Sequence, residues 1–113
     1  MSHDIIYFHI GDSDYLLTSI KQLQHFNPSK KIHLIGRGVS DEVKKRVQFY
    51  DYEELLCRES SNFLHQFVNY STNNADFEKI CIFRWYLIRN LCIQENITRF
   101  FCLDSDVMVY CDL

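Results

Sequence analysis

Two apolar runs separated by an amphipathic segment constrain the fold more than any other feature of the chain. The runs cover residues 5–10 and 31–36 and are rich in isoleucine, leucine and aromatic residues, as buried strands are. Between them, apolar residues recur at the spacing of one helix face: Leu16, Leu17, Ile20 and Leu23. Asn27-Pro28 then ends the helical pattern. A strand, a helix and a strand in this order predict a βαβ unit with parallel strands and a right-handed crossover.

The middle of the chain continues the alternation of strands and helices. Ser40 or Asp41 is placed to cap a short helix that ends near Arg46, and residues 47–50 form a plausible third strand. Residues 52–56 suit a single helical turn. We therefore predict an α/β fold of the Rossmann-like type, with a mostly parallel sheet flanked by helices.

Residues 58–96 contain a mixed segment and then a long helix. An apolar, helix-like cluster comes first and consists of Phe63, Leu64, Phe67 and Val68. The polar run 71–74 is predicted to be a loop. Residues 76–96 contain no glycine or proline and many large apolar side chains, which predicts a long and heavily buried helix.

The last stretch holds the chemistry that stands out in this chain. The apolar residues 100–103 run directly into Asp104 and Asp106, and Val107 and Val109 alternate after them. This pattern predicts a buried strand that ends by presenting two carboxylates, followed by a final short strand. Two carboxylates at the mouth of an apolar strand repel one another, so a divalent cation is their natural partner. The alternative is a polar turn without a metal.

The end of the first predicted strand is expected beside this acidic pair. Ligands of open α/β sheets gather outside the carboxyl ends of the strands. His9, Ile10, Gly11 and Asp12 should therefore lie on the same edge of the sheet as Asp104, Ser105 and Asp106. Gly11 would let a ligand approach the backbone closely. The alternative is that Gly11 makes only a turn, and that Asp12 or Ser13 caps the next helix.

Composition limits the remaining possibilities. With 113 residues, 47% of them hydrophobic, the chain has ordinary globular composition and is expected to form one domain at most. A net charge of −3 disfavours nucleic acid as a partner. The chain has no transmembrane segment and no signal peptide by pattern, so a cytoplasmic location is expected.

Cysteines and histidines do not form a recognisable metal-binding pattern. The five cysteines lack Cys-x-x-Cys spacing, and we expect reduced core residues at Cys57, Cys81, Cys92, Cys102 and Cys111. The spacing of His9, His25, His33 and His65 does not suggest a set of metal ligands, so structural or surface positions are expected for them.

The carboxylate motif and its flanks resemble the Asp-x-Asp motif of nucleotide-sugar-dependent glycosyltransferases with the GT-A fold. The resemblance rests on Phe101-Cys102-Leu103-Asp104-Ser105-Asp106-Val107-Met108-Val109, followed by Asp112-Leu113. It implies that Asp104 and Asp106 hold Mn²⁺ or Mg²⁺ across the diphosphate of a nucleotide-diphosphate sugar, with a UDP-sugar the first expectation. The alternative role for Asp104 is contact with the ribose. The resemblance also implies that residues 9–12 and Ser105 contact the donor.

A second part of the resemblance lies on the long predicted helix. Glycosyltransferases of this type often carry an aromatic-Arg pattern just before the Asp-x-Asp strand, and this chain offers Ile82-Phe83-Arg84-Trp85-Tyr86. The family pattern implies that Arg84 grips the donor diphosphate, for which a planar guanidinium is suited. The alternative is that Arg84 reaches solvent or pairs with Glu78.

The resemblance covers residues 1–113 as the N-terminal, donor-binding half of such an enzyme. We expect the acceptor site, a further metal ligand and any general base to lie beyond Leu113, so that the chain is truncated at its C-terminus. No catalytic residue is assigned. The activity implied is transfer of a sugar to the hydroxyl of a glycan or other acceptor. Two alternatives remain: a haloacid-dehalogenase-type phosphohydrolase with a nucleophilic aspartate, and a non-catalytic sugar-nucleotide-binding remnant.

Overall fold

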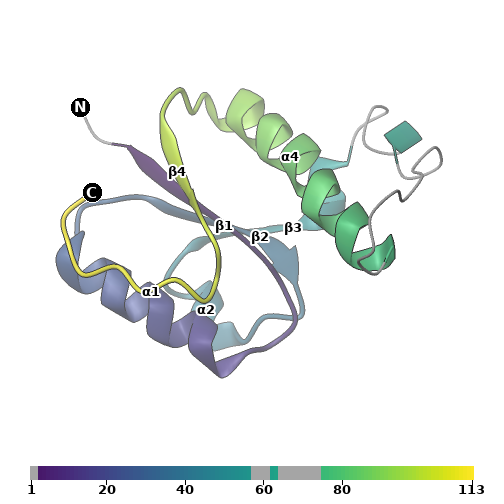
Figure 1. The fold of residues 1–113 in the computed structure, drawn as a ribbon. Coiled ribbons are helices and arrows are strands. Elements are labelled where there is room, and N and C mark those ends of the chain that lie inside the picture. Colours follow the sequence, from purple (N-terminus) through teal and green to yellow (C-terminus); the bar gives the residue numbers. More distant parts are fainter. Residues whose placement is uncertain (1–2, 57–61, 64–74) are drawn as a thin grey trace. The chain divides into compact units, whose positions relative to one another are not determined.

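The chain falls into two compact units in the computed structural model. The structure describes residues 3–56, 62–63 and 75–113 (Figure 1). The first unit comprises residues 1–51 and 98–113, and the second comprises residues 52–97.

A four-stranded parallel sheet organises the first unit. The strands are β1 (Asp4–Ile10), β2 (Ile32–Arg37), β3 (Gln48–Asp51) and β4 (Phe100–Leu103). Their order across the sheet is β3-β2-β1-β4, and every neighbouring pair is parallel (Figure 1). The predicted parallel α/β architecture is therefore confirmed, and β1 has a strand on each side.

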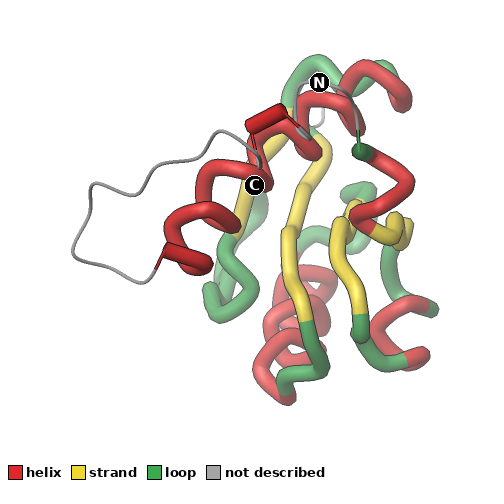
Figure 2. Tube along the Cα trace, turned by 90° about the vertical axis from the view of Figure 1, so that its right-hand side faces the viewer, coloured by secondary structure: helices red, strands yellow, loops and turns green. Residues whose placement is uncertain are grey.

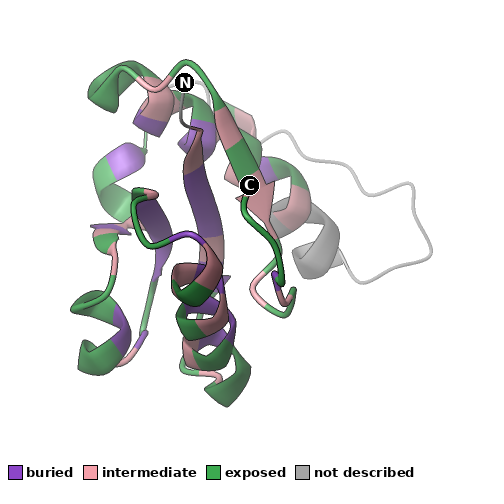
Figure 3. Ribbon diagram, turned by 90° about the vertical axis from the view of Figure 1, so that its left-hand side faces the viewer, coloured by how far each residue is buried: buried purple, intermediate pink, exposed green. Residues whose placement is uncertain are grey.

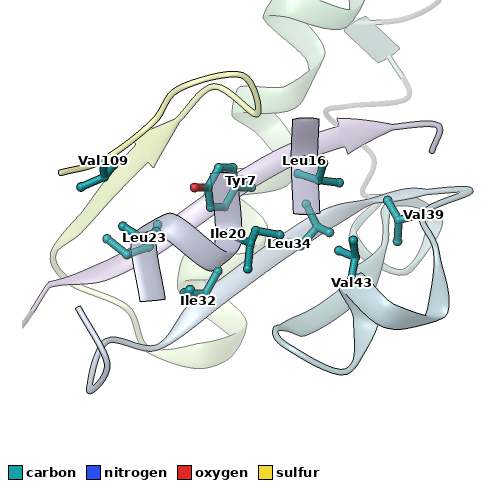
Figure 4. Packing of buried hydrophobic residues seen from close by; sticks show 10 residues of the cluster. Tyr7, Leu16, Ile20, Leu23, Ile32, Leu34, Val39, Val43 and Val109 are labelled. Atoms are coloured by element: carbon teal, nitrogen blue, oxygen red, sulfur yellow. The ribbon is translucent and has the colours of Figure 1, made fainter. Parts of the chain in front are cut away.

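Helix α1 (Asp14–Phe26) covers one face of this sheet with the apolar stripe expected from the sequence. Its buried residues Leu16, Ile20 and Leu23 pack against the inward side chains of β1 and β2 (Figure 4). The other contributors to this core are Ile5, Tyr7, Ile32, Leu34, Val39, Val43 and Val109. Burial of this apolar surface holds the layers together, and the short helix α2 (Asp41–Lys44) contributes Val43 to it.

The two helix starts in this unit differ in their capping. Ser40 caps α2 as predicted, because its Oγ accepts a hydrogen bond from the backbone N–H of Val43 at 3.4 Å. Ser13 occupies the N-cap position of α1, but its side chain makes no capping bond. Its carbonyl oxygen accepts from the N–H of Leu16 at 3.1 Å instead. The predicted side-chain cap by Asp12 or Ser13 is therefore wrong.

Strand β4 is less buried than predicted. Phe101 is 37% exposed, and the other three residues of the strand are half-buried (Figure 3). The reason lies in the topology: β4 is the last strand in the order and pairs only with β1 among the described strands. An apolar run predicts a strand but does not distinguish a central strand from an edge strand.

The final strand predicted at Val107 and Val109 does not form. After β4 the chain runs along α1 as a loop to Leu113 (Figure 1). The hydroxyl of Ser19 donates to the carbonyl of Val107, and the amide of Asn27 donates to the carbonyl of Cys111 at 2.8 Å. The backbone of this segment is thus satisfied by side chains of α1 and not by a sheet ladder.

The second unit contains the 3₁₀ turn η1 (Tyr52–Leu55) and the long helix α4 (Ala75–Glu95). The side-chain amide of Asn90 donates to the carbonyl of Leu55 at 2.7 Å. Asn96, with a φ of 54°, ends the helix in the left-handed region that commonly closes helices. Both predicted helical elements are confirmed. The cluster and loop predicted over residues 63–74 lie outside the described residues, apart from Phe63.

Burial along α4 is one-sided, which corrects the prediction of a heavily buried helix. Among the α4 side chains that the structure describes, from Cys81 onward, the buried ones are Phe83, Leu87, Ile88 and Leu91. By contrast, Trp85 is 49% exposed and Ile93 is 68% exposed. In the part of the chain that the structure describes, no helix is long and apolar enough to cross a membrane.

The cysteines do not occupy the core positions predicted for them. Cys81, Cys92 and Cys102 are half-buried and Cys111 is exposed. These four are reduced, and Cys57 lies outside the described residues. A small thiol in an apolar run fits a half-buried position as well as a core position. The run alone therefore does not predict how deeply a cysteine is buried.

His33 and His25 occupy the structural and surface positions that the sequence suggested for the histidines. His33 is fully buried, with Nε2 at 2.8 Å from Asp4 and Nδ1 at 3.3 Å from the hydroxyl of Tyr50. His25 is exposed on α1, and His65 lies outside the described residues.

Candidate functional site

Three loops follow the carboxyl ends of β1, β2 and β4 and therefore meet at one edge of the sheet (Figure 2). They begin at Gly11, Gly38 and Asp104. Parallel pairing of β1 with β4 aligns Tyr7 with Leu103, so the loops after these strands start close together. This is the edge at which the sequence predicts a site.

Asp104 and Asp106 are the first and third residues of a tight turn. The carbonyl oxygen of Asp104 accepts a hydrogen bond from the N–H of Val107 at 3.0 Å, which reverses the chain at Ser105-Asp106. Both aspartates are exposed, whereas Ser105 between them is half-buried. Both carboxylates therefore belong to the same turn.

A hydrogen bond joins the end of β1 to this turn. His9 Nδ1 lies 2.9 Å from Ser105 Oγ, although the two residues are 96 positions apart. His9 is only 7% exposed, and its burial lowers the pKa of the imidazole below the usual 6.5, while the charge of Asp12 opposes that shift. Burial therefore favours the neutral ring, in which one nitrogen donates and the other accepts.

The second ring nitrogen of His9, Nε2, differs from Nδ1 in its contacts. Nε2 is buried and has no hydrogen-bond partner among the residues that the structure describes. The ring of Tyr15 packs edge-on against the imidazole, with 5.7 Å between the ring centroids. A buried nitrogen without a partner costs free energy, so His9 Nε2 is a position at which a water or ligand atom would be stabilising.

Glycines line the backbone beside the His9–Ser105 pair. Gly11 has a φ of +103°, and a Cβ built on it would meet no atom within 4 Å, so the space there is open. Its N–H donates to the carbonyl of Arg37 at 2.8 Å. Gly38 has a φ of +76°, and its ideal Cβ position lies 3.7 Å from the Cα of Gly11. This part of the edge therefore presents backbone to an approaching ligand.

Gly36 sets the spacing of the strands directly beneath the site. Gly36 is in register with His9 across the β1–β2 pair. A Cβ on Gly36 would lie 1.9 Å from the carbonyl oxygen of His9. The close approach at the base of the site is thus possible only for glycine. Sequence reasoning missed Gly36, Gly38 and Tyr15, although the run Gly36-Arg37-Gly38 after an apolar strand was a usable signal.

The predicted site residues belong to both units, and those of the first unit lie at one edge of the sheet. His9, Gly11, Asp12, Asp104, Ser105 and Asp106 lie at the carboxyl edge of the sheet, together with Ile10, which is 49% exposed. Arg84 is on α4 in the second unit, and its guanidinium carbon lies 5.4 Å from the ring centroid of Trp85. Arg84 is therefore held beside an aromatic ring, as its sequence context indicates.

The carboxylates of this edge do not amount to a complete metal cage. Among the described residues, no group of three or more His, Cys, Asp or Glu side chains is arranged to hold a metal ion. Asp104 and Asp106 supply hard oxygen ligands of the kind that Mg²⁺ and Mn²⁺ prefer, but they would leave most of the coordination sphere to other oxygens.

Comparison of the sequence with protein-family models and with curated proteins gives no match, and comparison with solved structures gives none either.

Proposed function

We propose that this chain is the donor-binding half of a glycosyltransferase of the GT-A type, which binds a nucleotide-diphosphate sugar through a divalent cation. The observation that carries the proposal is the turn at Asp104–Asp106, which follows a parallel strand and is hydrogen-bonded through Ser105 to His9 at the end of β1. The four-stranded parallel sheet supports it, because a Rossmann-like fold places ligands at this edge.

The chemistry of the edge suits a donor with many oxygens. Asp104 and Asp106 would hold Mn²⁺ or Mg²⁺, and the cation would neutralise charge on the diphosphate. Diphosphate oxygens would also complete a coordination sphere for which the protein offers two carboxylates. The cation should therefore bind weakly alone and more tightly with the donor.

The remaining residues of the edge have roles in orientation. Ser105 is fixed by His9, so its backbone and hydroxyl are held in one place for the donor. The open space over Gly11 leaves room for the nucleoside. A UDP-sugar is the donor to try first.

Calorimetric titration with a panel of nucleotide sugars, with and without Mn²⁺, tests the proposal. We expect Mn²⁺ to tighten the binding of at least one donor about tenfold or more, which corresponds to about 1.4 kcal/mol. Asp106→Asn should abolish this effect of Mn²⁺ while leaving the fold intact, because Asp106 is exposed on the turn. Asp112→Asn is the matched control, since it removes an exposed carboxylate of the same segment outside the turn.

Three outcomes would contradict the proposal. The first is an absence of Mn²⁺-dependent binding for every donor. The second is unfolding of Asp106→Asn, which would make Asp106 a structural turn residue. The third is steady hydrolysis of a phosphate ester with Mg²⁺ that is lost in Asp104→Asn, which would favour the phosphohydrolase alternative.

A further inference from the structure

A pocket lies beside the amino ends of β2 and β3, at the edge of the sheet opposite to the Asp104–Asp106 turn. It has a volume of about 220 Å³. Its residues come from two short segments: Lys30, Lys31 and Ile32 at the start of β2, and Lys45, Arg46, Val47 and Gln48 at the start of β3. The pocket therefore lies within the first unit and is separate from the carboxylate edge.

Four cationic side chains line this pocket. They are Lys30, Lys31, Lys45 and Arg46. The ion pairs that the described residues form elsewhere, such as Lys21 with Glu42 and Arg37 with Asp51, involve none of the four. No acidic residue lines the pocket. In a chain of net charge −3, this is a local concentration of positive charge that the described part of the chain does not neutralise.

Arg46 is positioned by contacts with α1. Its carbonyl oxygen accepts from the side-chain amide of Gln24 at 2.9 Å, and its guanidinium donates back to the Gln24 oxygen at 3.3 Å. These two bonds restrict the backbone and the side chain of Arg46 together. Less conformational freedom is then lost when the guanidinium meets an anion.

The size of the pocket limits its ligand. About 220 Å³ is smaller than the sites of about 300–1,000 Å³ that enclose drug-sized molecules. Three ammonium groups and one guanidinium suit the several oxygens of a phosphate or diphosphate group. Similar positive charge at the carboxylate edge would require a bound metal, whereas here the protein provides it.

We propose that the pocket formed by Lys30, Lys31, Lys45 and Arg46 binds a small phosphate-bearing anion without a metal ion. The ligand class is a free phosphate or diphosphate, or a phosphorylated group of similar size. Binding there is independent of the glycosyltransferase proposal, because it uses neither Asp104 nor Asp106.

Titration of the full chain with inorganic diphosphate in EDTA tests the inference. EDTA removes divalent ions, so the carboxylate edge repels the anion and contributes no binding. The double variant Lys31→Gln/Lys45→Gln should weaken diphosphate binding about tenfold, equivalent to about 1.4 kcal/mol. The control Lys21→Gln/Lys44→Gln makes the same change in net charge outside the pocket and should bind nearly as tightly as the wild type.

Amide chemical shifts locate the bound anion. We expect diphosphate to move the resonances of Ile32, Val47 and Gln48, and the effect to fall as salt is raised from about 50 to 300 mM because screening shortens the range of the charges. Unchanged affinity in the pocket variant, or equal losses in the two double variants, would overturn the proposal. So would shifts confined to residues near Gly11, or binding of vesicles with anionic headgroups without binding of diphosphate.

Discussion

Replacement of Gly36 by alanine tests how closely β1 and β2 must approach beneath the candidate site. The new Cβ would be placed 1.9 Å from the carbonyl oxygen of His9 and 3.0 Å from its carbonyl carbon. Real Cβ atoms essentially never approach another heavy atom within 3.0 Å, so the two backbones must separate by about 1 Å. Neither strand can yield easily, because β1 is paired on both sides and β2 is paired with β3.

The expected cost follows from this geometry. Forcing extra volume into a packed region costs about 1–3 kcal/mol when side chains can move, and here the contact is with backbone, so we expect about 3 kcal/mol or more. Urea unfolding followed by far-UV circular dichroism measures the change in the free energy of unfolding. Gly11→Ala is the matched control: a Cβ there meets no atom within 4 Å, and the positive φ alone should cost about 1–2 kcal/mol.

A loss below about 1 kcal/mol for Gly36→Ala, or a loss no larger than that of Gly11→Ala, would refute the close approach. If the Gly36→Ala protein is stable, the backbone of His9 must have moved away from the new Cβ. The shift of the Ser105 amide resonance reports that movement, because Ser105 is bonded to His9.

Two further predictions concern hydrogen bonds between residues that are far apart in the sequence. Because burial lowers the pKa of His9, the unfolded chain takes up a proton as the pH falls through about 6.5 while the folded chain does not, so stability falls until the pH passes the folded pKa. His9→Asn, which keeps a polar atom near Ser105, should lose less stability between pH 8 and pH 5 in urea titrations; equal losses would contradict burial of a neutral ring. Asn27→Ala should cost about 2 kcal/mol and speed hydrogen exchange at the Leu113 amide, since Asn27 bonds Cys111 and Leu113; unchanged exchange would show that the final segment is held otherwise.

The parallel sheet and its first helix follow from local patterns, which explains why sequence reasoning reached them. Alternating apolar runs and a 3.6-residue stripe depend on near neighbours, and the crossover rule then aligns the strands. The position of Asp104 beside the end of β1 followed from a general property of parallel sheets. Those features needed no knowledge of individual side-chain contacts.

The features that the sequence did not reveal depend on contacts between distant residues. Ser19 and Asn27 capture the backbone of the last segment across separations of 88 and 84 positions, and this prevents the strand that Val107 and Val109 suggest. The contact of Gly36 with His9 depends on strand register, which no local pattern specifies. The exposure of Cys111 likewise follows from the path of the loop.

Helix α1 restrains the segment after the Asp104–Asp106 turn. Asn27 at the end of the helix accepts from the N–H of Leu113 at 2.6 Å, and its amide donates to the carbonyl of Cys111, while β4 anchors the other end of the segment to β1. The conformational entropy of this loop is consequently lost when the chain folds. If the proposed donor binds at the two aspartates, it would meet a preorganised loop, and its association should carry a small entropic penalty and proceed without a slow rearrangement.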